Sequence, residues 1–189
     1  KERGACPDAA DYGIKERFSN KTAIAPTASI SIICGGTSPG IEPIAANSYT
    51  HKTLSGSYNV KNKYLENILS KYEKNNTEVW SSITTNQGSV SHLDFLTNQE
   101  KEVFKTAFEL NQKWIVELGA DRTPYISQAQ SINIFLPADV HKKELHQIHL
   151  QAWKKGLKSL YYCRSKSIQR AENVNNGLST ETTIAGTKE

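Results

Sequence analysis

Two adjacent tyrosines, Tyr161 and Tyr162, are the residues with the most distinctive chemistry in this chain. A phenol has a pKa of about 10, so at neutral pH it keeps its proton and must release it when it loses an electron. Two phenol rings in contact can therefore pass both an electron and a proton between them. Successive side chains on a regular strand point to opposite faces, so such contact requires a bend in the backbone. The alternative is two ordinary strand aromatics, one in the core and one outside.

A second candidate site is the segment Ala25–Ser31, whose residues are small or carry hydroxyl groups, apart from Pro26 and Ile30. It lies between a short apolar run and a glycine-rich loop, residues 34–40. Where a strand gives way to a helix, several backbone N–H groups lack partners, and small side chains let an anion approach them. Such a segment can bind phosphate without a lysine, and the following loop lacks the Gly-Lys-Ser/Thr sequence of a P-loop. The alternative is an ordinary capped helix start.

The remaining nucleophilic and metal-binding residue types form no convincing site. Three cysteines lie far apart with neither CxxC nor zinc-ligand spacing, which favours free thiols in a reducing compartment. No role is assigned to any of them: Cys6, Cys34 and Cys163. Three histidines share one predicted helix, but no carboxylate or cysteine completes a ligand set, so we expect no metal at His141, His146 or His149. Glu42 precedes a proline, and we interpret it as structural rather than as a general base.

Length and composition indicate a single folded domain. The chain has 189 residues, of which 37% are hydrophobic and 22% charged, enough for a real core. The net charge of +4 is mild, and lysines alternate with glutamates in residues 63–74, so we expect no direct binding of nucleic acid. No signal peptide or membrane span is recognisable, so we expect a cytoplasmic protein. Because the chain starts with Lys1 and lacks methionine, we expect a processed piece, a fragment or half of a split protein.

The first half of the chain predicts short elements around the hydroxyl-rich segment. We expect a short helix over 9–18, a buried strand over 22–25, and a helix over 27–33 capped by Thr27 or Ser29, although extended chain is also possible there. A strand pair follows over 49–60, turning at Ser55-Gly56. The predicted helices span residues 63–74, 78–85 and 97–118; the last is capped by Thr97 with Glu100 and places Trp114 in its core stripe.

The second half predicts the unit that carries the tyrosines. We expect a strand over 131–136, a helix over 140–155, and a strand over 158–163. The helix is capped by Asp139, ends at Gly156 and places Trp153 in its core stripe. Strand, helix, strand at this length predicts two parallel strands with a right-handed crossover. We expect residues 1–170 to be folded and 171–189 to be a flexible tail, because the tail has almost no large apolar residues.

Five ordered segments together resemble one enzyme family, the large (α) subunit of class I ribonucleotide reductases. The matching segments are Ala25–Ser31, Gly40–Pro43, Asp121-Arg122, Gln128–Ile134 and Trp153–Arg164. The resemblance implies the C-terminal portion of a ten-stranded α/β barrel. It also implies that Thr27, Ala28, Ser29 and Ile30 hold the diphosphate of a ribonucleotide. Many relatives have threonine where this chain has Ile30, so only the main chain can contribute there.

The same resemblance implies the function and the partners. Tyr161 and Tyr162 would relay a radical from a metal-containing small (β) subunit to an active-site cysteine, during reduction of ribonucleoside diphosphates to deoxyribonucleoside diphosphates. Thioredoxin or glutaredoxin would re-reduce the whole enzyme, and the whole large subunit would form a homodimer. The family's radical cysteine and redox cysteine pair lie upstream of this region, so the chain needs the N-terminal remainder and is expected to be inactive alone, with no cofactor of its own. The alternative is a non-catalytic phosphate- or nucleotide-binding α/β module with the tyrosines in its core.

Overall fold

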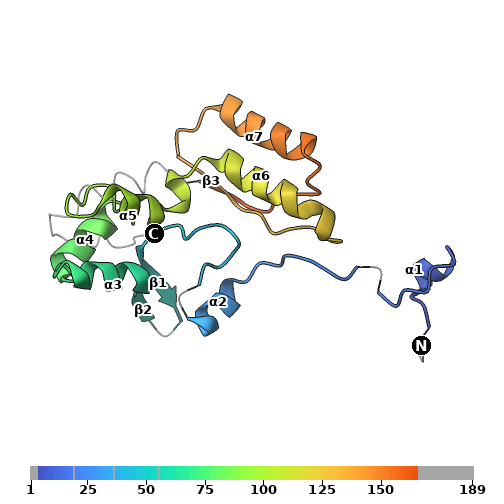
Figure 1. Ribbon diagram of the computed structural model, residues 1–189, viewed down its shortest axis with the longest axis horizontal. Coiled ribbons are helices and arrows are strands. Elements are labelled where there is room, and N and C mark those ends of the chain that lie inside the picture. Colours follow the sequence, from blue (N-terminus) through green and yellow to red (C-terminus); the bar gives the residue numbers. More distant parts are fainter. Residues whose placement is uncertain (1–3, 19, 36, 55, 166–189) are drawn as a thin grey trace, which may run out of the picture.

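The computed structural model of the protein describes residues 4–18, 20–35, 37–54 and 56–165 (Figure 1). Two groups of elements follow one another along the chain. The first group, over residues 48–103, contains a hairpin and three helices, and the second, over residues 112–154, contains two helices that lie beside a strand. Helix α1 (Pro7–Ala10) lies apart from both, at the far end of an extended segment. The predicted tail, 171–189, lies outside the described residues.

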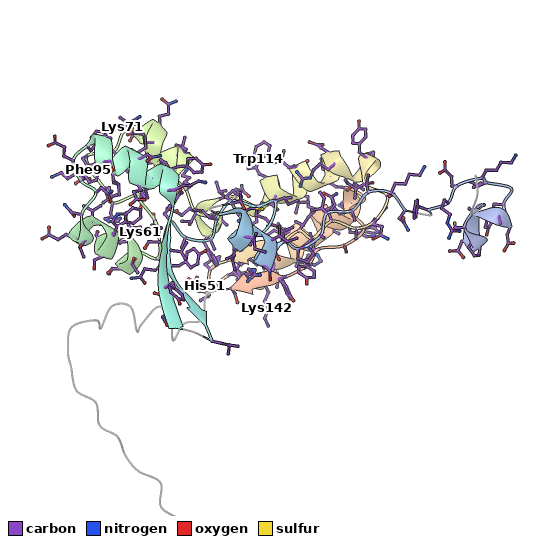
Figure 2. The ribbon with its side chains drawn as sticks, turned by 90° about the horizontal axis from the view of Figure 1, so that it is seen from below. His51, Lys61, Lys71, Phe95, Trp114 and Lys142 are labelled. Atoms are coloured by element: carbon purple, nitrogen blue, oxygen red, sulfur yellow. The ribbon has the colours of Figure 1, made fainter. Side chains whose placement is uncertain are left out.

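The segments before the hairpin are mostly extended. The predicted helix over 9–18 is wrong: α1 ends early, and Gly13 follows with a φ of +69°, a backbone conformation that interrupts a helix. Helix α2 (Ala28–Cys34) confirms the helical alternative for the hydroxyl-rich segment. Strands β1 (Ser48–Thr53) and β2 (Gly56–Lys61) form the predicted antiparallel hairpin, which projects from the helices (Figure 2).

A first core forms between α3 (Lys63–Lys71), α4 (Thr77–Thr85) and α5 (Asn98–Val103). Its buried members are apolar side chains from α3, from α4, from the loop between α4 and α5, and from the residue after α5: Leu65, Leu69, Trp80, Ile83, Val90, Leu93, Leu96 and Phe104. Asn47 ties the hairpin to this core, because its side-chain amide donates to the Gly88 carbonyl (2.9 Å) and to the Phe104 carbonyl (2.7 Å). The hairpin is therefore held by buried polar contacts at its base.

The predicted single helix over 97–118 is wrong, because the chain breaks it twice. The capping box of Thr97 and Glu100 is present as predicted, but α5 ends after six residues. A second capping box follows, in which Glu109 accepts from the Thr106 N–H (2.8 Å) and starts the 3₁₀ helix η1 (Ala107–Glu109). Helix α6 (Gln112–Arg122) then begins at its own cap, where Asn111 accepts from the Lys113 N–H (3.0 Å).

The second core packs α6 and α7 (Lys142–Lys154) against β3 (Ile134–Leu136). The two helices lie side by side (Figure 1). Strand β4 (Cys163–Ser165) pairs with β3 in parallel, which confirms the predicted parallel strands. A single parallel bridge joins Ile24 to Gln130, so the extended segment around Ile24 lies beside the residues that lead into β3. We call these extended segments, together with α6 and α7, the wall. Within the described residues the wall is one open section and forms no closed barrel.

Several boundaries in this second unit differ from prediction. The predicted strand over 158–163 begins only at Cys163. Asp139 does not cap α7, because His141 stands at the N-cap and its Nδ1 accepts from the Lys143 N–H (3.1 Å). Gly156 follows the helix at a φ of +78°, as predicted. The expected core positions of two tryptophans are wrong: Trp114 (Figure 2) is 66% exposed and Trp153 is 74% exposed.

Within the described residues, no helix combines the length and apolar character that crossing a membrane requires.

Candidate functional site

Strand β3 is the fixed element of the site, because it is buried on every side. Ile132, Ile134 and Leu136 are at most 1% exposed. The buried side chain of Gln112 holds this strand to the start of α6. Its Oε1 accepts from the Phe135 N–H (2.8 Å), and its Nε2 donates to two carbonyls before α6, those of Ala107 (2.9 Å) and Leu110 (2.8 Å). A buried amide with three partners fixes the position of the strand that faces the tyrosines.

The two tyrosines sit where the pairing with β3 slips by one residue. The Ile134 N–H donates to the Tyr162 carbonyl (2.8 Å), as the register of Ile134 with Cys163 requires. Continued regularly, this ladder would pair the Tyr162 N–H with the Ile132 carbonyl. The donor there is instead the Tyr161 N–H (2.8 Å). Tyr161 and Tyr162 therefore both lie opposite one residue, Asn133. Two residues opposite one is the local distortion of a β-bulge.

This slip supplies the bend that ring contact requires. The ring centroids of Tyr161 and Tyr162 are 4.1 Å apart with an interplanar angle of 56°. The Tyr161 hydroxyl donates to the Tyr162 hydroxyl at 3.4 Å, which is longer than the usual O–H···O distance of about 2.7–2.8 Å. In the part of the chain that the structure describes, neither ring lies in a core, contrary to the alternative of one buried ring, because Tyr161 and Tyr162 are 48% and 52% exposed.

The surroundings of Tyr161 favour its neutral phenol. The hydrogen bond to Tyr162 is the main cause that raises the pKa of Tyr161, with smaller contributions from the charge interaction with Tyr162 and from burial; Arg164 opposes them. The guanidinium carbon of Arg164 lies 5.3 Å from the centre of the Tyr162 ring. A cation over the ring disfavours a second positive charge there. Loss of an electron from this ring is therefore tied to loss of its proton.

A pocket of about 370 Å³ lies against the tyrosines, between α7 and the segment that leads to β4. His149 and Trp153 line it from α7, and Tyr161, Tyr162 and Cys163 line it from the other side. No residue of the segment 27–30 contributes to this pocket. The tyrosines thus have an open side that is separate from the predicted phosphate site.

The predicted phosphate site lies at the start of α2. The N–H and the hydroxyl of Thr27 both donate to the Pro39 carbonyl (3.2 and 3.0 Å), so this residue folds the following loop back onto the helix start. The N–H groups of Ala28, Ser29 and Ile30 have no hydrogen-bond partner among the described residues, and their side chains are exposed. Three adjacent amides in the first helical turn are accessible to an anion.

Glu42 connects this loop to the tyrosine-bearing wall. The carboxylate is 5% exposed and accepts from both the backbone N–H and the Nδ2 of Asn133, the latter at 3.3 Å. The hydroxyl of Ser38 donates to the Glu42 carbonyl (2.6 Å). These contacts agree with the structural interpretation of Glu42. Sequence reasoning assigned no role to its partner Asn133 or to Gln112, although both are polar residues within predicted elements, the strand over 131–136 and the helix over 97–118.

The other candidate residues are not brought together. All three cysteines lie in the described part of the chain and form no disulfide. His141 caps α7, and the His149 Nδ1–H donates to the Leu145 carbonyl (2.8 Å). In the part of the chain that the structure describes, no three potential metal ligands converge.

The family model of the ribonucleotide reductase barrel domain matches residues 7–163. The chain belongs to the ribonucleotide reductase family. It is 54% identical over 176 residues to the ribonucleoside-diphosphate reductase large subunit of Invertebrate iridescent virus 6, and 47% identical over 181 residues to that of Invertebrate iridescent virus 3. These alignments cover 91% and 94% of this chain. The family suggested by the five sequence segments is therefore confirmed.

A solved structure supports the barrel assignment. The α subunit of the class Id ribonucleotide reductase from Actinobacillus ureae matches with a TM-score of 0.74 and 39% sequence identity, over 88% of this chain. The chain spans 18% and 28% of the two viral reductase subunits and 29% of the Actinobacillus chain. The described wall of parallel segments is thus a section of the reductase barrel domain.

Proposed function

We propose that this chain is the C-terminal part of the large subunit of a class I ribonucleoside-diphosphate reductase. In the whole enzyme it takes part in reducing ribonucleoside diphosphates to deoxyribonucleoside diphosphates by a radical mechanism. The observation that carries the proposal is the contact between the Tyr161 and Tyr162 rings on an exposed side of the wall. The names of the related viral proteins, ribonucleoside-diphosphate reductase large subunits, support it.

The tyrosine pair relays the radical as a hydrogen-atom exchange. A phenoxyl radical at Tyr162 accepts the electron and the proton of the Tyr161 hydroxyl, so that Tyr162 becomes a phenol and Tyr161 the radical. The direction of the hydrogen bond, from Tyr161 to Tyr162, suits this step. The raised pKa of Tyr161 suits it too, because the phenol keeps its proton until its electron leaves.

The start of α2 binds the substrate diphosphate. Thr27 shapes the site by holding the loop at Pro39, while Ala28, Ser29 and Ile30 donate their backbone N–H groups to phosphate oxygens. The partial positive charge of the helix start adds to this attraction. The side chain of Ile30 carries no hydroxyl, so its contribution is limited to the main chain.

The partners follow from the same proposal. A metal-containing small subunit generates the radical, and the N-terminal remainder of the large subunit supplies the cysteine that receives it. Thioredoxin or glutaredoxin reduces the enzyme after turnover, and the complete large subunits form a homodimer in the cytoplasm. This chain alone is inactive, because it holds the relay and the phosphate site without the reacting cysteine.

The test is the substitution Tyr162→Phe in the complete large subunit, assayed with the small subunit. Phenylalanine keeps the ring contact but has no hydroxyl to oxidise, so turnover is abolished while the affinity for the diphosphate substrate stays near that of the wild type. The matched control is Tyr64→Phe, which removes the hydroxyl of a tyrosine that is 60% exposed on α3. Loss of substrate binding with turnover preserved per bound substrate would count against the relay role of Tyr162.

A further inference from the structure

We propose that Glu42 is a positioning residue that links the phosphate-binding segment to the tyrosine pair. The inference rests on the proposed function and adds a coupling between its two parts. Glu42 contacts neither the amides at the start of α2 nor the phenol rings. It acts through Pro39 on one side and Asn133 on the other.

On the phosphate side, the loop from 37 to 42 is closely folded around the Glu42 carboxylate. Thr27 is bound to Pro39 by two hydrogen bonds, and the neighbouring Ser38 donates to the Glu42 carbonyl. A Cβ at Gly40 would lie against Glu42 Oε2, so any other residue there would require the carboxylate to shift. A movement of the helix start is therefore transmitted to Glu42 through a short, folded connection.

On the tyrosine side, the carboxylate holds Asn133 at two points. One oxygen accepts from its backbone N–H and the other from its side-chain Nδ2. Both residues are buried, at 5% and 8% exposure, where a charge-assisted hydrogen bond is stronger than in water. The orientation of the amide is set by its partner, because a flipped amide would place Asn133 Oδ1 against the carboxylate.

Asn133 is the single residue that the two tyrosines face. Its neighbours Ile132 and Ile134 carry the carbonyl and the N–H that bind Tyr161 and Tyr162. The hydroxyl–hydroxyl distance of 3.4 Å is at the limit of a hydrogen bond, so a small shift of Asn133 changes whether the proton can transfer. Occupation of the phosphate segment and alignment of the relay are thereby linked through Glu42.

The direct test uses this chain and inorganic pyrophosphate as the probe. Amide hydrogen exchange at Ile134 and Tyr161 is measured with and without pyrophosphate. The wild type gains protection at both amides when pyrophosphate binds, and Glu42→Gln loses this gain, because the NH2 group of glutamine cannot replace the second acceptor oxygen. Glu42→Asp keeps two acceptor oxygens and retains part of the gain, whereas the control Glu78→Gln, at an exposed position in α4, behaves as the wild type.

The second readout is turnover of the complete large subunit with its small subunit. Glu42→Gln lowers kcat on the order of 10²-fold, the size expected for a misplaced reacting group, and raises KM as well. The coupling is overturned if pyrophosphate protects neither amide in the wild type, if Glu42→Gln keeps the full gain, or if only KM changes. A wild-type enzyme without ribonucleotide reduction would instead refute the proposed function, whatever the exchange experiment shows.

Discussion

Replacing Gln112 by leucine tests how the wall that carries the tyrosines is held. The substitution removes the acceptor of the Phe135 N–H and the donor to two carbonyls, while keeping a side chain of similar size. The buried N–H left without a partner costs about 1–3 kcal/mol, and each of the two carbonyl hydrogen bonds contributes about 1 kcal/mol. Burial of the leucine methyl groups offsets about 1 kcal/mol. The free energy of unfolding is therefore expected to fall by about 2–4 kcal/mol.

Equilibrium unfolding in urea measures this change, with the midpoint and the slope followed together. The control is Gln147→Leu, at an exposed position of α7, which is expected to change the unfolding free energy by at most about 0.5 kcal/mol. Amide exchange at Phe135 shows whether the loss occurs at β3. Equal effects of the two substitutions, or unchanged protection at Phe135, would refute the argument that Gln112 anchors the wall.

Three further predictions concern single positions. Ser29→Trp blocks the approach to the amides at the start of α2, so in the complete enzyme KM for a ribonucleoside diphosphate rises with little change in kcat; an unchanged KM would contradict the phosphate assignment. Arg164 lowers the pKa of Tyr161, so Arg164→Gln is expected to raise that pKa further. An NMR titration of the ring should then show tyrosinate forming at higher pH, and formation at lower pH would contradict the prediction. Gly88→Ala and Gly156→Ala both place alanine at a positive φ, at a cost of about 1–2 kcal/mol. Of these two positions, only Gly88 brings the new Cβ within 3 Å of other atoms. Urea unfolding should therefore show the larger loss of unfolding free energy for Gly88→Ala.

The elements were predictable where their signals are local. The capping box at Thr97, the antiparallel strand pair β1–β2 and the left-handed Gly156 each follow from a few neighbouring residues. The break in the helix over 97–118 was missed, although Thr106 and Glu109 form the same capping pattern as Thr97 and Glu100. A long apolar stripe outweighed this signal in the prediction.

The tertiary features were less predictable from the chain alone. Ring contact depends on the slip opposite Asn133, which is a property of the pairing between two segments and has no signature in either one. Trp114 and Trp153 fit helical stripes, but the described core is filled from other faces of α6 and α7. Gln112 and its partner Phe135 are separated by 23 positions in the sequence, and Glu42 and its partner Asn133 by 91 positions. No local pattern indicates which partners a buried polar side chain will find.

The central claim is that the two phenols pass a radical directly from Tyr162 to Tyr161. The most direct measurement is electron paramagnetic resonance of the complete enzyme during turnover, with ring-deuterated tyrosine in the large subunit to distinguish its radicals from those of the small subunit. With Tyr161→Phe, the account predicts that a radical reaches Tyr162 and stops there, without product. With Tyr162→Phe, it predicts no radical at Tyr161. Product formation by Tyr161→Phe at the wild-type rate, or a radical at Tyr161 in Tyr162→Phe, would contradict it.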